Sequence, residues 1–287
     1  MIGSKARRYI NVGCGTTFIN SPEWLNLDLN STNEGVENSL LRDLIRRGLS
    51  GQFDGIYCSH LIEHFDRNEF CSFLDQCNQL LRSGGGLRIV TPDFDSIVAK
   101  YFEALAAGNL SRASFEKILL LEQCIRTVPS GSYRKDIAKI MDSDDSLDDY
   151  IVNRTGESAL GRSNNARVLH RSKDRRWHAI LRRAHLRLIK KWRRRSAQLL
   201  RLLAPTSLKG NVSTTDAGER HLWIYSFFEL KEFGKEHHYR DVTQVDGSRS
   251  NIFSCLDIEQ LDLLPGGEPR KGEHSMYVEM FKADIHI

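Results

Sequence analysis

Tyr9-Ile-Asn-Val-Gly-Cys-Gly15 and, shortly after it, Glu23-Trp-Leu-Asn-Leu-Asp-Leu29 decide how this 287-residue chain is interpreted. The first stretch is an apolar run that ends in a glycine turn. Glycine has no Cβ, so the backbone can turn sharply there and a ligand can approach it. The second stretch is also apolar and carries Asp28 near its end. A glycine turn after one strand and a carboxylate at the tip of the next are typical of a nucleoside site, where the acid accepts hydrogen bonds from a ribose diol.

One ligand class that uses such an arrangement is the nicotinamide dinucleotides. A dinucleotide fingerprint requires a third small residue three places after the second glycine. Phe18 stands at that position after Gly15, so the residues disfavour a nicotinamide cofactor.

The connection between the two predicted strands is short. Only eleven residues separate Val12 from Trp24 and Pro22 is among them, so the connection has room for one or two helical turns at most.

The two stretches resemble the opening of the class I S-adenosylmethionine-dependent methyltransferases. More narrowly, they resemble the bacterial glycan-associated, methyltransferase type 11-like subgroup, whose strands read Leu-Asn-Leu-Gly-Cys-Gly and Trp-Leu-Asn-Leu-Asp. The resemblance implies an α/β fold with a Rossmann-like, doubly wound, seven-stranded sheet whose last strand is antiparallel. It also implies S-adenosyl-L-methionine as cofactor. The residues that it assigns to the cofactor are Asn11, Gly13, Cys14, Gly15, Asp28, Leu29, Asp43, Ser59 and His60.

Asp43 enters that set through an expected third strand. Residues 31–39 are polar and predict a loop, whereas Leu40-Leu-Arg-Asp-Leu-Ile45 is apolar. In the resembling family a third strand that ends in Asp-Leu falls here and lies beside the adenine. A solvated acid on a helical turn is the alternative interpretation of Asp43.

The stretch Gln52-Phe-Asp-Gly-Ile-Tyr-Cys-Ser-His60 predicts a fourth strand, and Leu61-Ile-Glu-His-Phe65 follows it. This segment resembles the family pattern Phe-Asp-x-Ile-Tyr-x-Ser-His-x-Leu-Glu-His. Ligands of open α/β sheets bind beyond the carboxyl ends of strands, which places His60 near a substrate. The Glu63-His64 pair is similar to metal-binding positions in some methyltransferases, but no further acid or histidine is identifiable nearby in the sequence. We therefore predict no metal ion and a structural role for the pair.

The next segment predicts a helix followed by a fifth strand. Apolar residues recur at helical spacing over 69–81, and Arg82-Ser-Gly-Gly-Gly86 is expected to end that helix with glycine. Leu87-Arg-Ile-Val-Thr-Pro-Asp93 then reads as a strand that brings Asp93 to the same cleft as His60. Further helices are predicted over 97–107, 115–128 and 227–238, and the last two strands over 242–245 and 276–282.

A basic insertion interrupts the resemblance, so that three regions are expected: a core over 1–128, a helical charged insertion over 129–210, and the completion of the core over 211–287. Residues 162–201 carry fifteen Lys or Arg and one acid, Asp174, in a chain of net charge +4. Ser172–Ala204 has apolar residues, Trp177 and Trp192 among them, at helical spacing among arginines. The expectations for it are packing on its own domain, docking on an anionic membrane surface, or nucleic-acid binding as a less favoured choice.

The composition restricts the compartment. No run of eighteen apolar residues exists, the six cysteines form no Cys-x-x-Cys pair, and residues 1–8 hold no apolar signal core. We expect a cytoplasmic enzyme, peripheral on the inner membrane leaflet if the basic helix docks there. Oligomeric state is open.

Methyl transfer to a hydroxyl needs a general base, and histidine is suited to it at neutral pH. The candidates are His60, then His221, then Asp93. The leading prediction is O-methylation of a sugar hydroxyl in a glycan or lipid-linked saccharide, which rests on the resemblance. The alternatives are an RNA or small-molecule methyltransferase that uses the basic insertion, and a catalytically silent binding module of the same fold.

Overall fold

The computed structural model describes residues 8–29, 31–124, 147–156 and 221–284. Most of the expected insertion over 129–210 lies outside these ranges, and so does the whole of the predicted helix over 172–204. Within the described ranges, no helix has both the length and the apolar character needed to cross a membrane.

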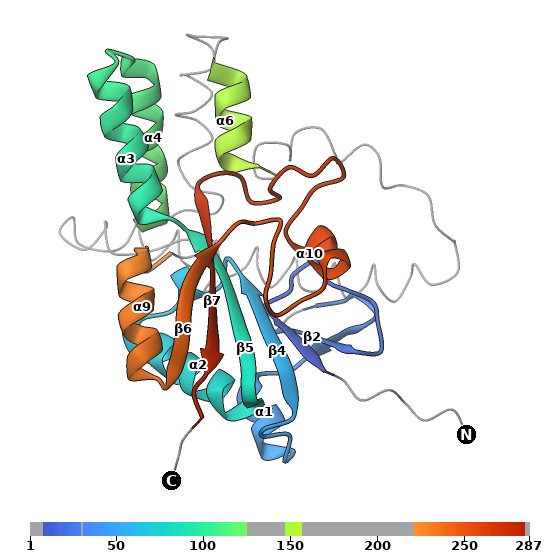
Figure 1. Cartoon of the computed structure of the whole chain (residues 1–287). Helices are drawn as coiled ribbons and strands as arrows, with labels where there is room; N and C mark the ends of the chain where they lie inside the picture. Colours follow the sequence, from blue (N-terminus) through green and yellow to red (C-terminus); the bar gives the residue numbers. More distant parts are fainter. Residues whose placement is uncertain (1–7, 30, 125–146, 157–220, 285–287) are drawn as a thin grey trace, which may run out of the picture.

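Seven strands form a single sheet in the order β3-β2-β1-β4-β5-β7-β6 (Figure 1). Neighbouring strands are parallel from β3 to β5, whereas β7 runs antiparallel to both β5 and β6. The predicted Rossmann-like sheet with an antiparallel last strand is therefore confirmed. The strands are β1 Tyr9–Val12, β2 Trp24–Asp28, β3 Val36–Asn38, β4 Phe53–Ser59, β5 Leu81–Pro92, β6 Tyr239–Val245 and β7 Ser275–Lys282.

Helices cover both faces of the sheet, because the side chains of each strand alternate between two cores. In β4, Ile56 and Cys58 enter the larger core, while Tyr57 enters the smaller one on the opposite face. The larger core includes α1 Leu41–Arg46, α2 Arg67–Leu80 and α9 Phe227–Glu236, and the smaller one includes α10 Cys255–Leu261. A third cluster joins α3 Phe94–Ala106, α4 Leu110–Cys124 and α6 Asp148–Thr155, which project beyond one end of the sheet (Figure 1).

The expected third strand over 40–45 is wrong. The strand is β3, at Val36–Asn38 inside the predicted loop, and residues 41–46 form helix α1. The buried residues of α1 are Leu41 and Leu44, whose spacing of three suits one helical face and cannot serve one face of a strand. Asp43 accepts a hydrogen bond from the N–H of Leu40 at 3.1 Å, so that its carboxylate caps the helix.

The helix before the fifth strand does not end at the glycines. Helix α2 ends at Leu80, and Leu81 is already extended and paired with Phe53. The ladder then resumes at Gly86 opposite Gly55, so that residues 82–85 form an irregularity inside β5. A Cβ on Gly55 or Gly86 would lie 2.7 or 2.5 Å from the Ile252 side chain, which explains glycine at both positions.

Candidate functional site

A cavity of about 390 Å³ opens at the carboxyl ends of β1 and β4. In a parallel sheet this is the edge at which ligands bind. Its lining combines the turn after β1, the end of β4, and two groups from the chain's C-terminal part. The lining residues are Asn11, Gly13, Cys14, Gly15, Thr16, Thr17, Tyr57, Ser59, His60, Leu261 and Lys271.

The glycine turn has a backbone that side chains would strain. Gly13 and Gly15 have φ of +64° and +55°, in the left-handed region that favours glycine. A Cβ on Gly13 would also lie 2.9 Å from Cδ1 of Leu61. The buried Asn11 donates from Nδ2 to the carbonyl of Thr17 at 3.0 Å and holds the two ends of the turn together. The turn is thus a formed cradle whose backbone faces the cavity.

Asp28 ends β2 next to this cradle. Its Oδ2 accepts a hydrogen bond from the N–H of Gly15 at 2.8 Å, and the N–H of Cys14 donates to the carbonyl of Leu27 at 3.0 Å. The predicted pairing of a glycine turn with a carboxylate is therefore present as a direct contact. Leu29 is the next residue and is 59% exposed.

Cys14 and Ser59 line the cavity from the turn and from the end of β4. Burial, with the nearby charge of Asp28, raises the pKa of the Cys14 thiol to about 12. The thiol therefore stays protonated and is no nucleophile at neutral pH. Ser59 precedes His60, the residue with which the chain turns away from the sheet.

His60 is held by two contacts in an uncommon backbone conformation, with φ of +50°. Its Nδ1 lies 3.1 Å from Oε1 of Glu63, and its Nε2 lies 3.0 Å from Oγ of Ser275. A carboxylate only accepts, so the contact with Glu63 favours the tautomer with the proton on Nδ1 and the lone pair on Nε2. Burial lowers the pKa of His60, although Glu63 opposes that effect. The imidazole is therefore neutral, oriented and at the cavity wall.

The other two candidates for the base lie elsewhere. Asp93 caps α3 by accepting from the N–H of Ser96 at 3.1 Å, and burial raises the pKa of its carboxyl. His221 is buried and lies beside Glu63 and His64. Neither is among the cavity-lining residues, and of the predicted cofactor residues Asp28, Leu29 and Asp43 are not among them either.

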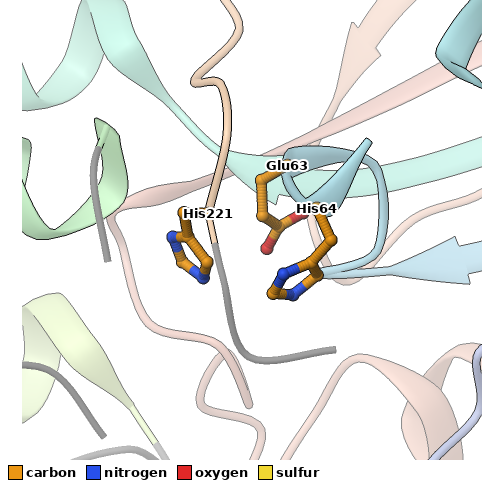
Figure 2. Close-up of side chains that lie close together, drawn as sticks. All are labelled: Glu63, His64 and His221. Carbon is orange, nitrogen blue, oxygen red and sulfur yellow. The ribbon is translucent and has the colours of Figure 1, made fainter. Parts of the chain in front are cut away.

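Glu63, His64 and His221 form a cluster that the sequence did not reveal. One potential ligand atom from each lies within 4.8 Å of the others. Figure 2 shows the Glu63 carboxylate directed toward the space between the two imidazole rings. Glu63 and His64 belong to the short helix η1 Ile62–His64, and His221 begins the segment that leads to α9. The histidine that sequence reasoning looked for near Glu63-His64 is thus 157 positions further along.

The cavity also contains residues that the sequence analysis missed. Thr16 and Thr17 directly follow the glycine turn, so their position in the chain was an available signal. Tyr57 is an apolar strand residue, and nothing in its pattern separates it from the core. Leu261 and Lys271 lie more than two hundred residues from the turn, and no local pattern indicates their place here.

Comparison with known proteins gives similarity of arrangement only. No family model matches the chain, and no curated protein matches it either. Among solved structures, an Archaeoglobus fulgidus SAM-dependent methyltransferase is 13% identical, with a TM-score of 0.38, over 97% of this chain and 87% of that one. The CurJ carbon methyltransferase is 10% identical, with a TM-score of 0.38, over 99% of this chain and 50% of that one.

A third structure is the 1,6-didemethyltoxoflavin-N1-methyltransferase of Burkholderia thailandensis with bound 1,6-didemethyltoxoflavin and S-adenosylhomocysteine. It is 9% identical, with a TM-score of 0.38, over 96% of this chain and 71% of that one. Such low identities and TM-scores carry no inference about the reaction or the ligands of this chain.

Proposed function

We propose that this chain binds S-adenosylmethionine in the cavity at the ends of β1 and β4 and transfers its methyl group to a hydroxyl. The observation that carries the proposal is the contact of Asp28 with the N–H of Gly15, which joins a carboxylate to a glycine cradle at the edge of a parallel sheet. A nucleoside with a free ribose diol fits that combination of acceptor and open backbone.

The residues present fit such a cofactor. The positive φ angles of Gly13 and Gly15 keep the cradle free of side chains, and nothing lies within 4 Å of where a Cβ of Gly15 would stand. Asp28 would accept from the ribose, Ser59 would contact the remainder of the ligand, and His60 would face the acceptor. When bound, the cofactor supplies an electrophilic methyl group on a sulfonium sulfur.

His60 is the base that we propose for the acceptor. Because Nδ1 lies beside the Glu63 carboxylate, the Nε2 lone pair is the one that would take the acceptor's hydroxyl proton. The acceptor oxygen would bond to the methyl carbon as the carbon–sulfur bond breaks, which leaves S-adenosylhomocysteine. In the structure Nε2 lies 3.0 Å from Oγ of Ser275, a hydroxyl that also lies 3.3 Å from the carbonyl of Lys271. His221 and Asp93 are the second and third candidates for the general base.

The acceptor that we propose is a sugar hydroxyl in a glycan or a lipid-linked saccharide. The support is the resemblance of residues 9–28 and 53–64 to the glycan-associated subgroup. The fifteen basic residues over 162–201 would bring the enzyme to an anionic membrane surface that carries such a lipid. Sedimentation with anionic and neutral vesicles tests the membrane part, with binding to the anionic ones alone expected, and weaker in high salt.

The test of the central proposal is calorimetric titration with S-adenosylhomocysteine, using adenosine and the reduced nicotinamide cofactor as comparison ligands. Binding of S-adenosylhomocysteine at one site per chain is expected. Absence of binding would favour the silent module. Transfer of a labelled methyl group to saccharide, RNA or small-molecule acceptors then separates the enzyme alternatives.

A further inference from the structure

Glu63 differs from the other fully buried carboxylates that the structure describes. Glu116 pairs with Arg154, while Glu279 and Asp262 pair with Arg88, and all three acids are at most 1% exposed. Glu63 is also 0% exposed, yet in the described part of the chain its ion-pair partner is the imidazole of His60. A buried carboxylate without a full positive charge beside it is costly, because burial removes its hydration.

Three imidazoles face Glu63, and the Tyr225 hydroxyl and the Cys58 thiol are also near enough to interact with its charge. Oε1 faces His60 at 3.1 Å, and Oε2 has no hydrogen-bond donor among the described residues. His64 and His221 approach from two sides of the carboxylate, with their rings 4.8 Å apart between centroids (Figure 2). A carboxylate oxygen and two imidazole nitrogens therefore converge on one space.

The backbone places these groups before any ligand arrives. The carbonyl of Glu63 accepts from the N–H of Leu222 at 2.8 Å and from that of Trp223 at 3.3 Å. These two bonds attach the start of the segment before α9 to helix η1, and His221 precedes them directly. The convergence is thus built by tertiary contacts between elements far apart in the sequence.

We propose that Glu63, His64 and His221 bind one divalent transition-metal ion. Two imidazoles with one carboxylate are a donor set typical of zinc, iron, manganese and cobalt sites, whereas calcium and magnesium prefer all-oxygen sites. The ion supplies the positive charge that Glu63 lacks. Three protein ligands leave further coordination positions for water or for an oxygen of an acceptor.

The site is adjacent to the cavity and does not depend on it. His60 lines the cavity and contacts Oε1 of Glu63, so that Oε2 remains for the ion. Metal binding goes beyond the proposed methyl transfer, because a protein that bound no S-adenosylhomocysteine could still bind the metal. Failure of either proposal is therefore visible separately.

The experiment is a titration with cobalt(II), which serves as a spectroscopic probe. The full, tag-free chain is first treated with a chelator to remove bound metal ions. Visible absorption and calorimetry should report one bound cobalt ion per chain, displaced by zinc and not by magnesium or calcium. Glu63→Gln, His64→Ala and His221→Ala should each weaken binding by more than the roughly 10–100-fold that loss of an outer-shell contact costs. His237→Ala, in a histidine that pairs with Asp75 away from the cluster, is the matched control and should bind as wild type does.

Two results would overturn the proposal. One is absence of cobalt binding by the wild-type chain. The other is equal binding by all three variants, which would assign the metal to other histidines such as His170, His178 or His185. Circular dichroism checks that each variant folds. If the buried Glu63→Gln does not fold, His64→Ala and His221→Ala decide the outcome, since each removes one imidazole and leaves the carboxylate in place.

Discussion

The carboxylate of Asp28 accepts a hydrogen bond from the backbone N–H of Gly15 at 2.8 Å. This bond joins the end of β2 to the turn after β1, two points that are thirteen residues apart in sequence and adjacent at the sheet edge. It fixes the Asp28 carboxylate against the turn whose residues Gly13, Cys14 and Gly15 line the cavity. One contact therefore connects the shape of the proposed cofactor site with its charge.

Asp28→Ala should weaken binding of S-adenosylhomocysteine by about 1.5–3 kcal/mol, the range for hydrogen bonds to a charged group. The physical reason is the loss of the ribose acceptor together with the bond to Gly15. Calorimetric titration of variant and wild type measures the difference. Asp43→Ala is the control, because its carboxylate caps α1, and its affinity should equal that of wild type. Equal affinity of the Asp28 variant would remove that residue from the site.

His60→Gln should lower turnover by about 10²–10⁴-fold, the usual contribution of a general base, and leave affinity for S-adenosylhomocysteine nearly unchanged. The measurement is methyl transfer to whichever acceptor the screen identifies. Ser275→Ala is the comparison variant: it removes the hydroxyl that faces Nε2 and leaves the imidazole, so turnover should stay within a few-fold of wild type. If the His60 variant were fully active, the general base would be His221 or Asp93 instead.

Arg88→Met should destabilise the fold by about 3–5 kcal/mol, because it leaves two buried carboxylates without their cation. Arg88 is fully buried and pairs with Asp262 at 2.9 Å and with Glu279 at 2.8 Å. Urea unfolding measures the loss. Lys235→Ala breaks an exposed pair with Glu232 and should cost no more than about 1 kcal/mol. If the two variants lost similar amounts of unfolding free energy, Arg88 would not be the cation that stabilises the two buried carboxylates.

Stability should fall as the pH drops below about 6.5, partly through His274. Burial, with His60 nearby, lowers the pKa of His274 to about 3, and its Nδ1 contacts the carbonyl of Arg154. Between these two values the unfolded chain binds a proton that the folded chain does not, so acid favours unfolding. The contribution from pH 6.5 to 5 is about 1.6 kcal/mol.

Urea unfolding of His274→Gln at the two pH values checks this contribution. The variant keeps an N–H donor for the Arg154 carbonyl and loses the titrating group, so its stability should change less with pH than that of wild type. The exposed His238→Asn is the control and should keep the wild-type slope. If the free energy of unfolding of His274→Gln changed with pH as steeply as that of wild type, His274 would be excluded as a source of the pH dependence.

Local sequence patterns were sufficient to predict a strand where its residues are buried in a regular pattern. The runs over 9–12, 24–28, 53–59 and 87–92 alternate or are continuously apolar, and each lies in a strand of the sheet. The third strand was misplaced because β3 has three residues, none of them fully buried, while the apolar Leu41 and Leu44 belong to the helix after it. A short edge strand has too little buried surface to produce a pattern.

The sequence by itself determined the strands of the sheet other than β3, the glycine turn and the carboxylate of Asp28 at the end of the next strand, because these depend on backbone conformation and on burial within short segments. The tertiary structure alone decided which distant groups meet. Lys271 and Leu261 reach the cavity, Ser275 faces His60, and His221 joins Glu63 and His64. Those contacts follow from the antiparallel insertion of β7 beside β5 and from the hydrogen bonds of Leu222 and Trp223 to Glu63. Such pairings depend on how separate elements pack, and no spacing along the chain encodes them.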